Sequence, residues 1–199
     1  MKRVLLLTLL GAVLITCAHR WIAVPQNIRS FELCKSLNNG PQMLKVSQFK
    51  SAVIIVHDCS AMDEERVSIA MHIFLKKWKE QFPHNVVGNE RVEDALNSLS
   101  TEFSGAKKTA NAYRLDGTYG KDLTVSGLAL APGWIWVRIR PGERLCQTSF
   151  VHELVHVAIW ALKGSDGDPD HLGDKYSGWK MDHNILIQDT NQTLCDWGI

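Results

Sequence analysis

Two histidines and a glutamate stand at a spacing that suits metal chemistry. Residues 149–163 read SFVHELVHVAIWALK and contain His152-Glu153-Leu154-Val155-His156, an HExxH pattern. Side chains four residues apart lie on one face of an α-helix, so His152 and His156 can bind one Zn²⁺ from the same side. Glu153 is placed to take a proton from water rather than to bind the metal.

The flanking sequence predicts a helix around these residues. Thr148 and Ser149 are good N-cap residues, Lys163 suits the negative end of a helix, and Gly164 favours a stop. The segment between is apolar on nearly every side, which indicates a buried helix. Buried imidazoles and a carboxylate need partners, and a metal ion is the natural one. The alternative is a pair of core histidines that contact backbone carbonyls beside a salt-bridged glutamate.

The pattern and its helix resemble the zincin superfamily of zinc metallopeptidases. The sequence departs from the metzincin pattern HExxHxxGxxH, because Ile159 and Leu162 stand where the glycine and the third histidine would be. The third ligand must therefore come later in the chain. The resemblance implies an α+β fold with a mixed sheet backed by helices, the HExxH helix, and a short C-terminal subdomain.

The third ligand is expected after the helix, because a catalytic zinc takes three protein ligands and one water. His171 is the first choice, since it lies on a loop broken by glycine and proline that can fold back beneath the helix. The alternatives, in order, are Asp174, and then Asp168, Asp170 and His183. Three neutral histidines leave the one zinc ion its full charge, which lowers the pKa of a bound water.

Two further features of this loop bear on chemistry. Tyr176 can donate its hydroxyl to the oxyanion of a tetrahedral intermediate, with a packing role as the alternative. The alternating aspartates do not form an EF-hand, because His171 and Ser177 fall where that motif has a glycine and a glutamate. The aspartates instead suit hydrogen bonds to zinc-bound histidines.

Residues 1–18 are expected to be a signal peptide. Two basic residues precede an apolar run over 4–15, which is shorter than the ~20 residues that span a bilayer. Residues 14–17 resemble a bacterial lipobox in which Cys17 carries the lipid, although Thr16 stands at a position where a smaller residue is usual. Cleavage after residue 18 and an uncleaved anchor are the alternatives.

The remaining residues, 19–199, are expected to form one exported domain in the bacterial cell envelope. Its membrane contact would be through a lipid anchor alone, and a soluble periplasmic or secreted protein is the alternative. The chain has a net charge of +1 and no basic run, which argues against a nucleic-acid partner. The sequence leaves the oligomeric state open.

Four cysteines remain after residue 18, namely Cys34, Cys59, Cys146 and Cys195. An even number in an oxidising compartment predicts two disulfides. Cys146 with Cys195 would tie the end of the chain to the start of the HExxH helix. Four buried free thiols are the alternative.

The middle of the chain predicts a sheet with helices. Residues 19–50 and 104–122 read as irregular, with the latter an exposed loop. We expect a buried strand over 52–56, an amphipathic helix of about 20 residues that ends at Pro83, a shorter helix over 92–103, and strands over 123–131 and 134–140. His57 and Asp58 close the first strand, either as a strand-end cap or as a catalytic pair.

In zincins an edge strand just before the active-site helix pairs with an extended peptide. Residues 134–140 hold that position here, with Trp134 and Trp136 expected on an aromatic and basic outer face. The sequence thus predicts a zinc peptidase that acts on a peptide or protein, with Glu153 as general base. The alternatives are a zinc-binding envelope lipoprotein without turnover, and a zinc hydrolase that cleaves a small amide or ester.

Overall fold

The computed structural model describes residues 21–32, 42–46, 48–57, 62–114, 119–140, 142–164 and 179–199. The helices are α1 (Glu64–Gln81), α2 (Val86–Asn97), the 3-10 turn η1 (Leu145–Gln147), α3 (Phe150–Lys163) and α5 (Met181–Asp196). The strands are β1 (Trp21–Glu32), β2 (Gln42–Lys45), β3 (Val53–Val56), β4 (Ser100–Ser104), β5 (Lys107–Arg114), β6 (Tyr119–Val125), β7 (Gly127–Ala131) and β8 (Trp134–Arg138).

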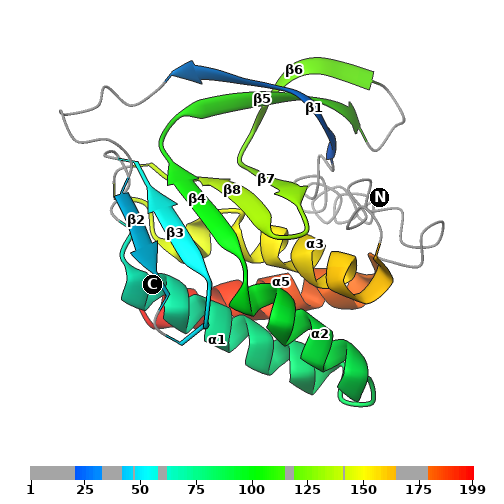
Figure 1. Cartoon of the computed structure of the whole chain (residues 1–199). Coiled ribbons are helices and arrows are strands. Elements are labelled where there is room, and N and C mark those ends of the chain that lie inside the picture. Colours follow the sequence, from blue (N-terminus) through cyan, green and yellow to red (C-terminus); the bar gives the residue numbers. More distant parts are fainter. Residues whose placement is uncertain are drawn as a thin grey trace, which may run out of the picture.

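Two sheets and one layer of helices make up the described part of the chain (Figure 1). The larger sheet has the order β2-β3-β4-β8-β7, in which β3, β4 and β8 run parallel and the outer strands β2 and β7 run antiparallel to their neighbours. The smaller sheet has the order β1-β5-β6 and is antiparallel. The fold is therefore α+β with a mixed sheet backed by helices, as the sequence predicts.

The helices cover one face of the larger sheet, and the smaller sheet lies over the other face (Figure 1). The main core forms between the larger sheet and the helices, with Trp78, Phe74, Phe103 and Phe150 among its largest fully buried side chains. A second, smaller core of Ala110, Val125, Leu128 and Trp136 holds the two sheets together.

The predicted long helix is confirmed as α1. Asp63 is its N-cap, and the carboxylate accepts a hydrogen bond of 2.8 Å from the Arg66 N–H, which satisfies one of the free donors of the first turn. Its apolar residues fall on one face, and Val67, Met71, Phe74 and Trp78 are buried in the main core. The helix ends at Gln81, two residues before Pro83.

Three segments that the sequence describes as irregular or helical are strands. Residues 100–104 form β4 rather than the end of a helix, because α2 ends at Asn97 and the chain turns at Ser98. Residues 107–114 and 119–122, predicted as part of an exposed loop, belong to β5 and to the start of β6. The region 19–50 contains β1 and β2. Strands β4 and β5 are largely polar in sequence and pair with strands far along the chain, so their local sequence does not indicate a strand.

The strand predicted over 134–140 is present as β8, whereas the strand predicted over 123–131 is divided between the end of β6 and β7. The predicted edge strand is wrong. Strand β8 lies between β4 and β7, and β7 is the edge strand beside α3. The expected outer aromatic face is also wrong in part. Trp134 is 41% exposed, whereas Trp136 is fully buried because the smaller sheet covers it.

Helix α5 is the last helix of the described chain, and it packs into the main core through Leu186 and Leu194. The predicted disulfide between Cys146 and Cys195 is confirmed, with a Cα–Cα distance of 5.4 Å. It joins η1, just before α3, to the end of α5. Closing a loop with a sequence separation of 49 residues restricts the unfolded chain and is worth about 4 kcal/mol.

Several sequence predictions concern residues outside the described ranges. The signal peptide, Cys17, Cys34, Cys59 and Asp58 all lie there. Among the described helices, none has both the length and the apolar character needed to cross a bilayer.

Candidate metal centre

Helix α3 forms as predicted and is fixed by packing on almost every side. Ser149 is its N-cap residue, while the Thr148 hydroxyl oxygen accepts a hydrogen bond of 3.2 Å from the Phe150 N–H. Gly164 ends the helix in the left-handed region, at φ 62°, which favours glycine. The buried apolar residues of the helix are Phe150, Val151, Leu154, Val155, Val157, Ala158 and Ile159.

The two histidines of the motif converge. His152 Nε2 and His156 Nε2 lie 3.2 Å apart, and the ring centroids are 4.9 Å apart at an interplanar angle of 73°. Two ligand atoms at ~2.0–2.1 Å from a tetrahedral zinc are ~3.3 Å apart, so this separation fits two ligands of one ion. Burial, with a smaller effect of His156, lowers the pKa of His152 to about 3. The neutral imidazole that a metal requires is therefore the favoured form.

Glu153 lies on the side of α3 that faces the edge strand β7. Its side chain is buried, at 4% exposure, and its carboxylate accepts a hydrogen bond from the Ala129 N–H. Burial raises the pKa of Glu153 to about 8, and the bond from Ala129 opposes that rise. Such a carboxyl can bind and release a proton near neutral pH, as a general acid–base group must.

Gly127, the first residue of β7, makes room for this carboxylate. A Cβ atom at this position would overlap the Ser149 hydroxyl and the Glu153 carboxylate. The Ser149 hydroxyl also donates a hydrogen bond of 2.8 Å to the Ser126 carbonyl, just before the strand. The start of β7 therefore has to be glycine for α3 to approach the strand this closely.

A tryptophan completes the described surroundings of the histidines. The Trp179 ring lies 4.9 Å from the His152 ring and 4.9 Å from the His156 ring, measured between centroids. Trp179 is 5% exposed and directly precedes Lys180, the N-cap residue of α5. The contacts of Trp179, Gly127 and Ala129 join distant segments of the chain, so no local pattern in the sequence indicates their roles.

The predicted site residues divide into two groups. His152, Glu153 and His156 lie together, whereas His171, Asp174, Tyr176, Asp168 and Asp170 lie outside the described residues. Within the described ranges, no cluster of three or more His, Cys, Asp or Glu side chains is arranged to hold a metal. His183 lies in the first turn of α5, where its Nδ1 accepts a hydrogen bond of 2.8 Å from the Lys180 N–H.

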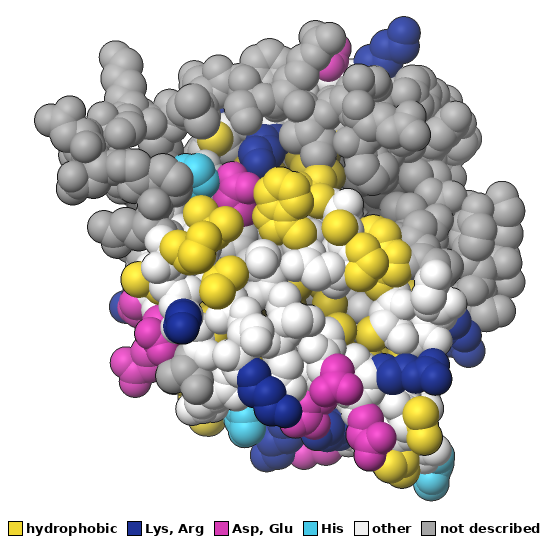
Figure 2. All heavy atoms as spheres, viewed as in Figure 1, with side chains coloured by type: hydrophobic (Ala, Val, Ile, Leu, Met, Phe, Trp, Pro, Cys, Tyr) yellow, Lys and Arg dark blue, Asp and Glu magenta, His cyan; other side chains and the backbone are white. Residues whose placement is uncertain are grey.

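A second polar cluster lies on the other face of the larger sheet. His57 Nε2 is 3.0 Å and Lys108 Nζ is 3.4 Å from Glu102 Oε1, and the Lys108 ammonium lies 4.7 Å from the centre of the Trp136 ring. Figure 2 shows hydrophobic side chains beside charged and histidine side chains on the viewed side of the molecule. Because Lys108 belongs to β5 and Glu102 to β4, the cluster joins the two sheets and lies apart from the HExxH helix.

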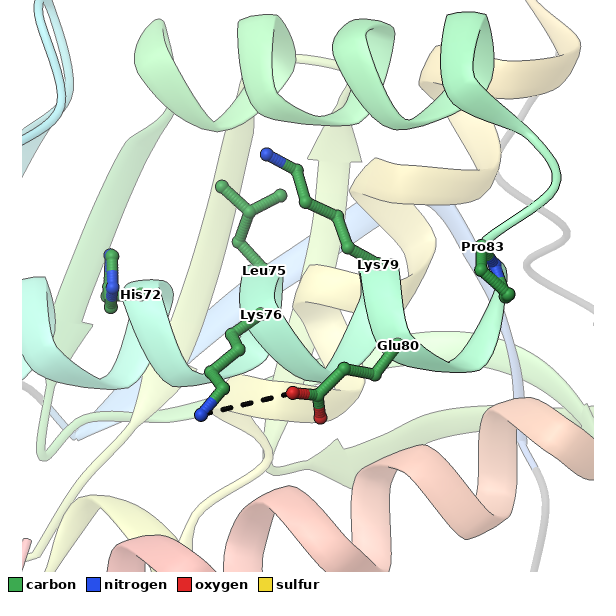
Figure 3. A pocket seen from close by; sticks show the side chains of 6 residues that line it. All are labelled: His72, Leu75, Lys76, Lys79, Glu80 and Pro83. Atoms are coloured by element: carbon green, nitrogen blue, oxygen red, sulfur yellow. Dashed lines mark ion pairs between the residues drawn. The ribbon is translucent and has the colours of Figure 1, made fainter.

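Two surface pockets formed by described residues lie away from the histidine pair. One pocket of about 530 Å³ lies along the outer side of α1 and is lined by His72, Leu75, Lys76, Lys79, Glu80 and Pro83 (Figure 3). A neighbouring pocket of about 460 Å³ lies between α1 and the end of α5, beside the exposed Trp197. Both are shallow regions with exposed charged rims.

Comparison of the chain with family models, curated proteins and solved structures finds no match.

Gly127→Ala should move the Glu153 carboxylate without unfolding the protein. The overlapping atoms are the ends of two side chains that can rotate away, so the free energy of unfolding should fall by only about 1 kcal/mol. Any hydrolysis that depends on Glu153 should fall about tenfold or more, because its carboxylate moves. Gly133→Ala is the control, since its Cβ would meet nothing nearer than 3.9 Å. Unchanged activity in Gly127→Ala would contradict the assigned position of Glu153.

The raised pKa of Glu153 predicts how stability depends on pH in the metal-free protein. The folded state keeps the carboxyl protonated up to about pH 8, whereas the same carboxyl in the unfolded chain ionises near pH 4.5. The stability that this group contributes is full below pH 4.5 and is lost as pH rises toward 8. As the pH rises from 5 to 8 in the presence of a metal chelator, the free energy of unfolding of wild type should therefore fall by about 1–3 kcal/mol relative to that of Glu153→Gln.

Denaturant unfolding at several pH values measures this difference. The lowered pKa of His152 has the opposite effect below pH 6.5, but both variants carry His152, so its contribution cancels. Glu90→Gln, at an exposed position on α2, is the control. Its free energy of unfolding should depend on pH in the same way as that of wild type. Parallel curves for wild type and Glu153→Gln would show that burial does not perturb this carboxyl.

Proposed function

We propose that this protein is a zinc-dependent peptidase of the zincin type. The observation that supports the proposal most directly is the geometry on α3, where two imidazole Nε2 atoms lie 3.2 Å apart and the intervening Glu153 is buried against an edge strand. The residues fit zinc, because both ligands are neutral nitrogen donors from one helix. His171 is proposed as the third ligand, with Asp174 as the alternative.

A zinc ion held by these residues would polarise the scissile carbonyl and lower the pKa of an attacking water. Glu153 would take the proton from that water and return it to the leaving amine. Tyr176 is proposed to donate a hydrogen bond to the oxyanion. The metal ligands orient the reacting groups, whereas Glu153 moves the proton.

Strand β7 is proposed to bind the peptide. It ends the larger sheet in the described part of the chain, and the Arg138 N–H of β8 donates a hydrogen bond of 2.8 Å to the Ser126 carbonyl. Because backbone groups of successive residues point to opposite sides, this register directs the Ala129 N–H away from β8 and toward Glu153. A peptide that pairs with this edge would bring its carbonyls next to the general base.

Metal analysis of the full chain with a Glu153→Gln variant tests the proposal. We expect one zinc per chain in both proteins, and a loss of peptide hydrolysis of about 10²–10⁴-fold in the variant, because only the proton transfer is removed. A pool of mixed peptides read by mass spectrometry serves as substrate. A Glu153→Gln variant that keeps its zinc and its hydrolysis would refute the assigned general base.

Zinc binding by histidine variants tests which residues are the metal ligands. His156→Ala should lose the zinc, and His171→Ala should weaken zinc binding much more than Asp174→Ala does. If Asp174→Ala has the larger effect, the ligand set is two histidines and an aspartate. Wild-type protein that binds no zinc would argue for a role without metal.

We also propose that the protein is exported and carries lipid on Cys17. The basic start, the short apolar run and the lipobox-like residues 14–17 support this proposal. Mass spectrometry of protein from a bacterial host should find a mature chain that begins at a lipidated Cys17, with no free thiol among the remaining four cysteines. An unmodified N-terminus at His19 would replace the anchor with a soluble exported protein.

A further inference from the structure

Three aromatic rings form a triangle at the HExxH helix. The centroids of His152, His156 and Trp179 are 4.9 Å apart in each of the three pairs. The Trp179 ring is inclined by 46° to one imidazole and by 42° to the other, so it contacts both. A single side chain from outside α3 therefore limits the rotation of both imidazoles, which present their Nε2 atoms 3.2 Å apart.

The indole is itself held in place by the first turn of α5. Trp179 Nε1 donates a hydrogen bond of 3.0 Å to Asn184 Oδ1. Lys180 is the N-cap residue of α5, so Trp179 occupies the position before the cap and Asn184 the fourth helical position. In many helices an apolar contact between these two positions fixes the entry of the chain, and here a hydrogen bond does so.

His183 connects this turn to the main core. Its Nδ1 accepts the Lys180 N–H, and its ring lies 5.6 Å from Trp78 and 5.3 Å from Phe82, between centroids. The Trp179 ring is 6.0 Å from the His183 ring. Contacts thus run from α1 through the start of α5 to the histidines of α3, and the position of Trp179 is determined by packing.

We propose that Trp179 is the positioning residue of the metal centre: it holds the His152 and His156 imidazoles in the rotamers that bind one zinc ion, and Asn184 fixes its orientation. This inference rests on the proposed zinc site. Side chains that orient metal ligands typically change metal affinity by about 10–100-fold when they are removed. Pre-set rotamers bind more tightly because little conformational freedom is lost on binding.

The nearby methionine does not have this role. Met181 lies two residues after Trp179 and resembles in sequence the methionine below the metal of metzincins, but its side chain is 68% exposed. Trp179, at 5% exposure, is the residue that contacts the histidines. Met181→Ala should therefore leave zinc affinity unchanged.

Zinc affinity, measured by competition with a chromophoric chelator, tests the proposal in the full chain. We expect Trp179→Ala to weaken binding about 10–100-fold and Trp179→Phe to stay within about threefold of wild type, because a phenyl ring still covers both imidazoles. Asn184→Ala should weaken binding about as much as Trp179→Phe, because both changes remove the Trp179–Asn184 hydrogen bond and keep a ring against the imidazoles. Trp197→Ala, at an exposed position at the end of the same helix, is the matched control. Circular dichroism establishes that each variant is folded.

A readout without metal separates this inference from the proposed function. In zinc-free protein, NMR signals of the His152 and His156 rings should shift and broaden in Trp179→Ala but not in Trp197→Ala, since an indole ring face shields nearby protons and limits rotation. If these signals are altered and wild type binds no zinc, the positioning contact stands and the peptidase proposal fails.

Several outcomes would overturn the inference itself. Folded Trp179→Ala that binds zinc within twofold of wild type would do so, as would unaltered histidine signals in the zinc-free variant. An affinity loss in Trp179→Phe as large as that in Trp179→Ala would also exclude a role for the ring faces. If Trp179→Ala does not fold, the zinc affinities of Trp179→Phe and Asn184→Ala test the proposal instead. A zinc affinity of Asn184→Ala equal to that of wild type would contradict the proposal that Asn184 fixes the orientation of Trp179.

Discussion

The near-complete burial of α3 is the constraint on which the rest of the site depends. A helix that is apolar on almost every side must be enclosed, and here the larger sheet, α2 and α5 enclose it. His152, Glu153 and His156 are its ionisable side chains before Lys163, so each must find a partner in a medium that disfavours charge. The low pKa of His152 and the high pKa of Glu153 follow from the same enclosure.

Helix α5 supports α3 from both of its ends. At one end the Cys146–Cys195 disulfide joins it to η1, which leads into α3. At the other end Trp179 contacts the two histidines, and His183 packs on Trp78 and Phe82 of α1. Because metal ligands need positions accurate to a fraction of an ångström, attachment at two points favours a rigid site over a mobile one.

The sequence predicts features whose signals are local. The end of α1 before Pro83, the apolar length of α3 and the stop at Gly164 each depend on neighbouring residues, and each is present. Strands β4 and β5 are not evident from the sequence, because STEFS and KKTANAYR are mostly polar and each pairs with a strand far along the chain. Sheet order is equally non-local, which explains why β8 rather than β7 was predicted at the edge. The ring contacts of Trp179 cross between helices, and no residue spacing reveals them.

The edge strand and the HExxH helix determine one another. Glu153 can be buried because the Ala129 N–H is directed away from β8 and supplies a hydrogen bond that a closed sheet would not offer. The strand can approach because Gly127 has no side chain to collide with that carboxylate or with Ser149. An edge strand normally needs protection from unwanted pairing, and here the carboxylate occupies one of its donors. The same contact therefore protects the strand and holds the proposed general base at the edge where the proposed peptide substrate would pair.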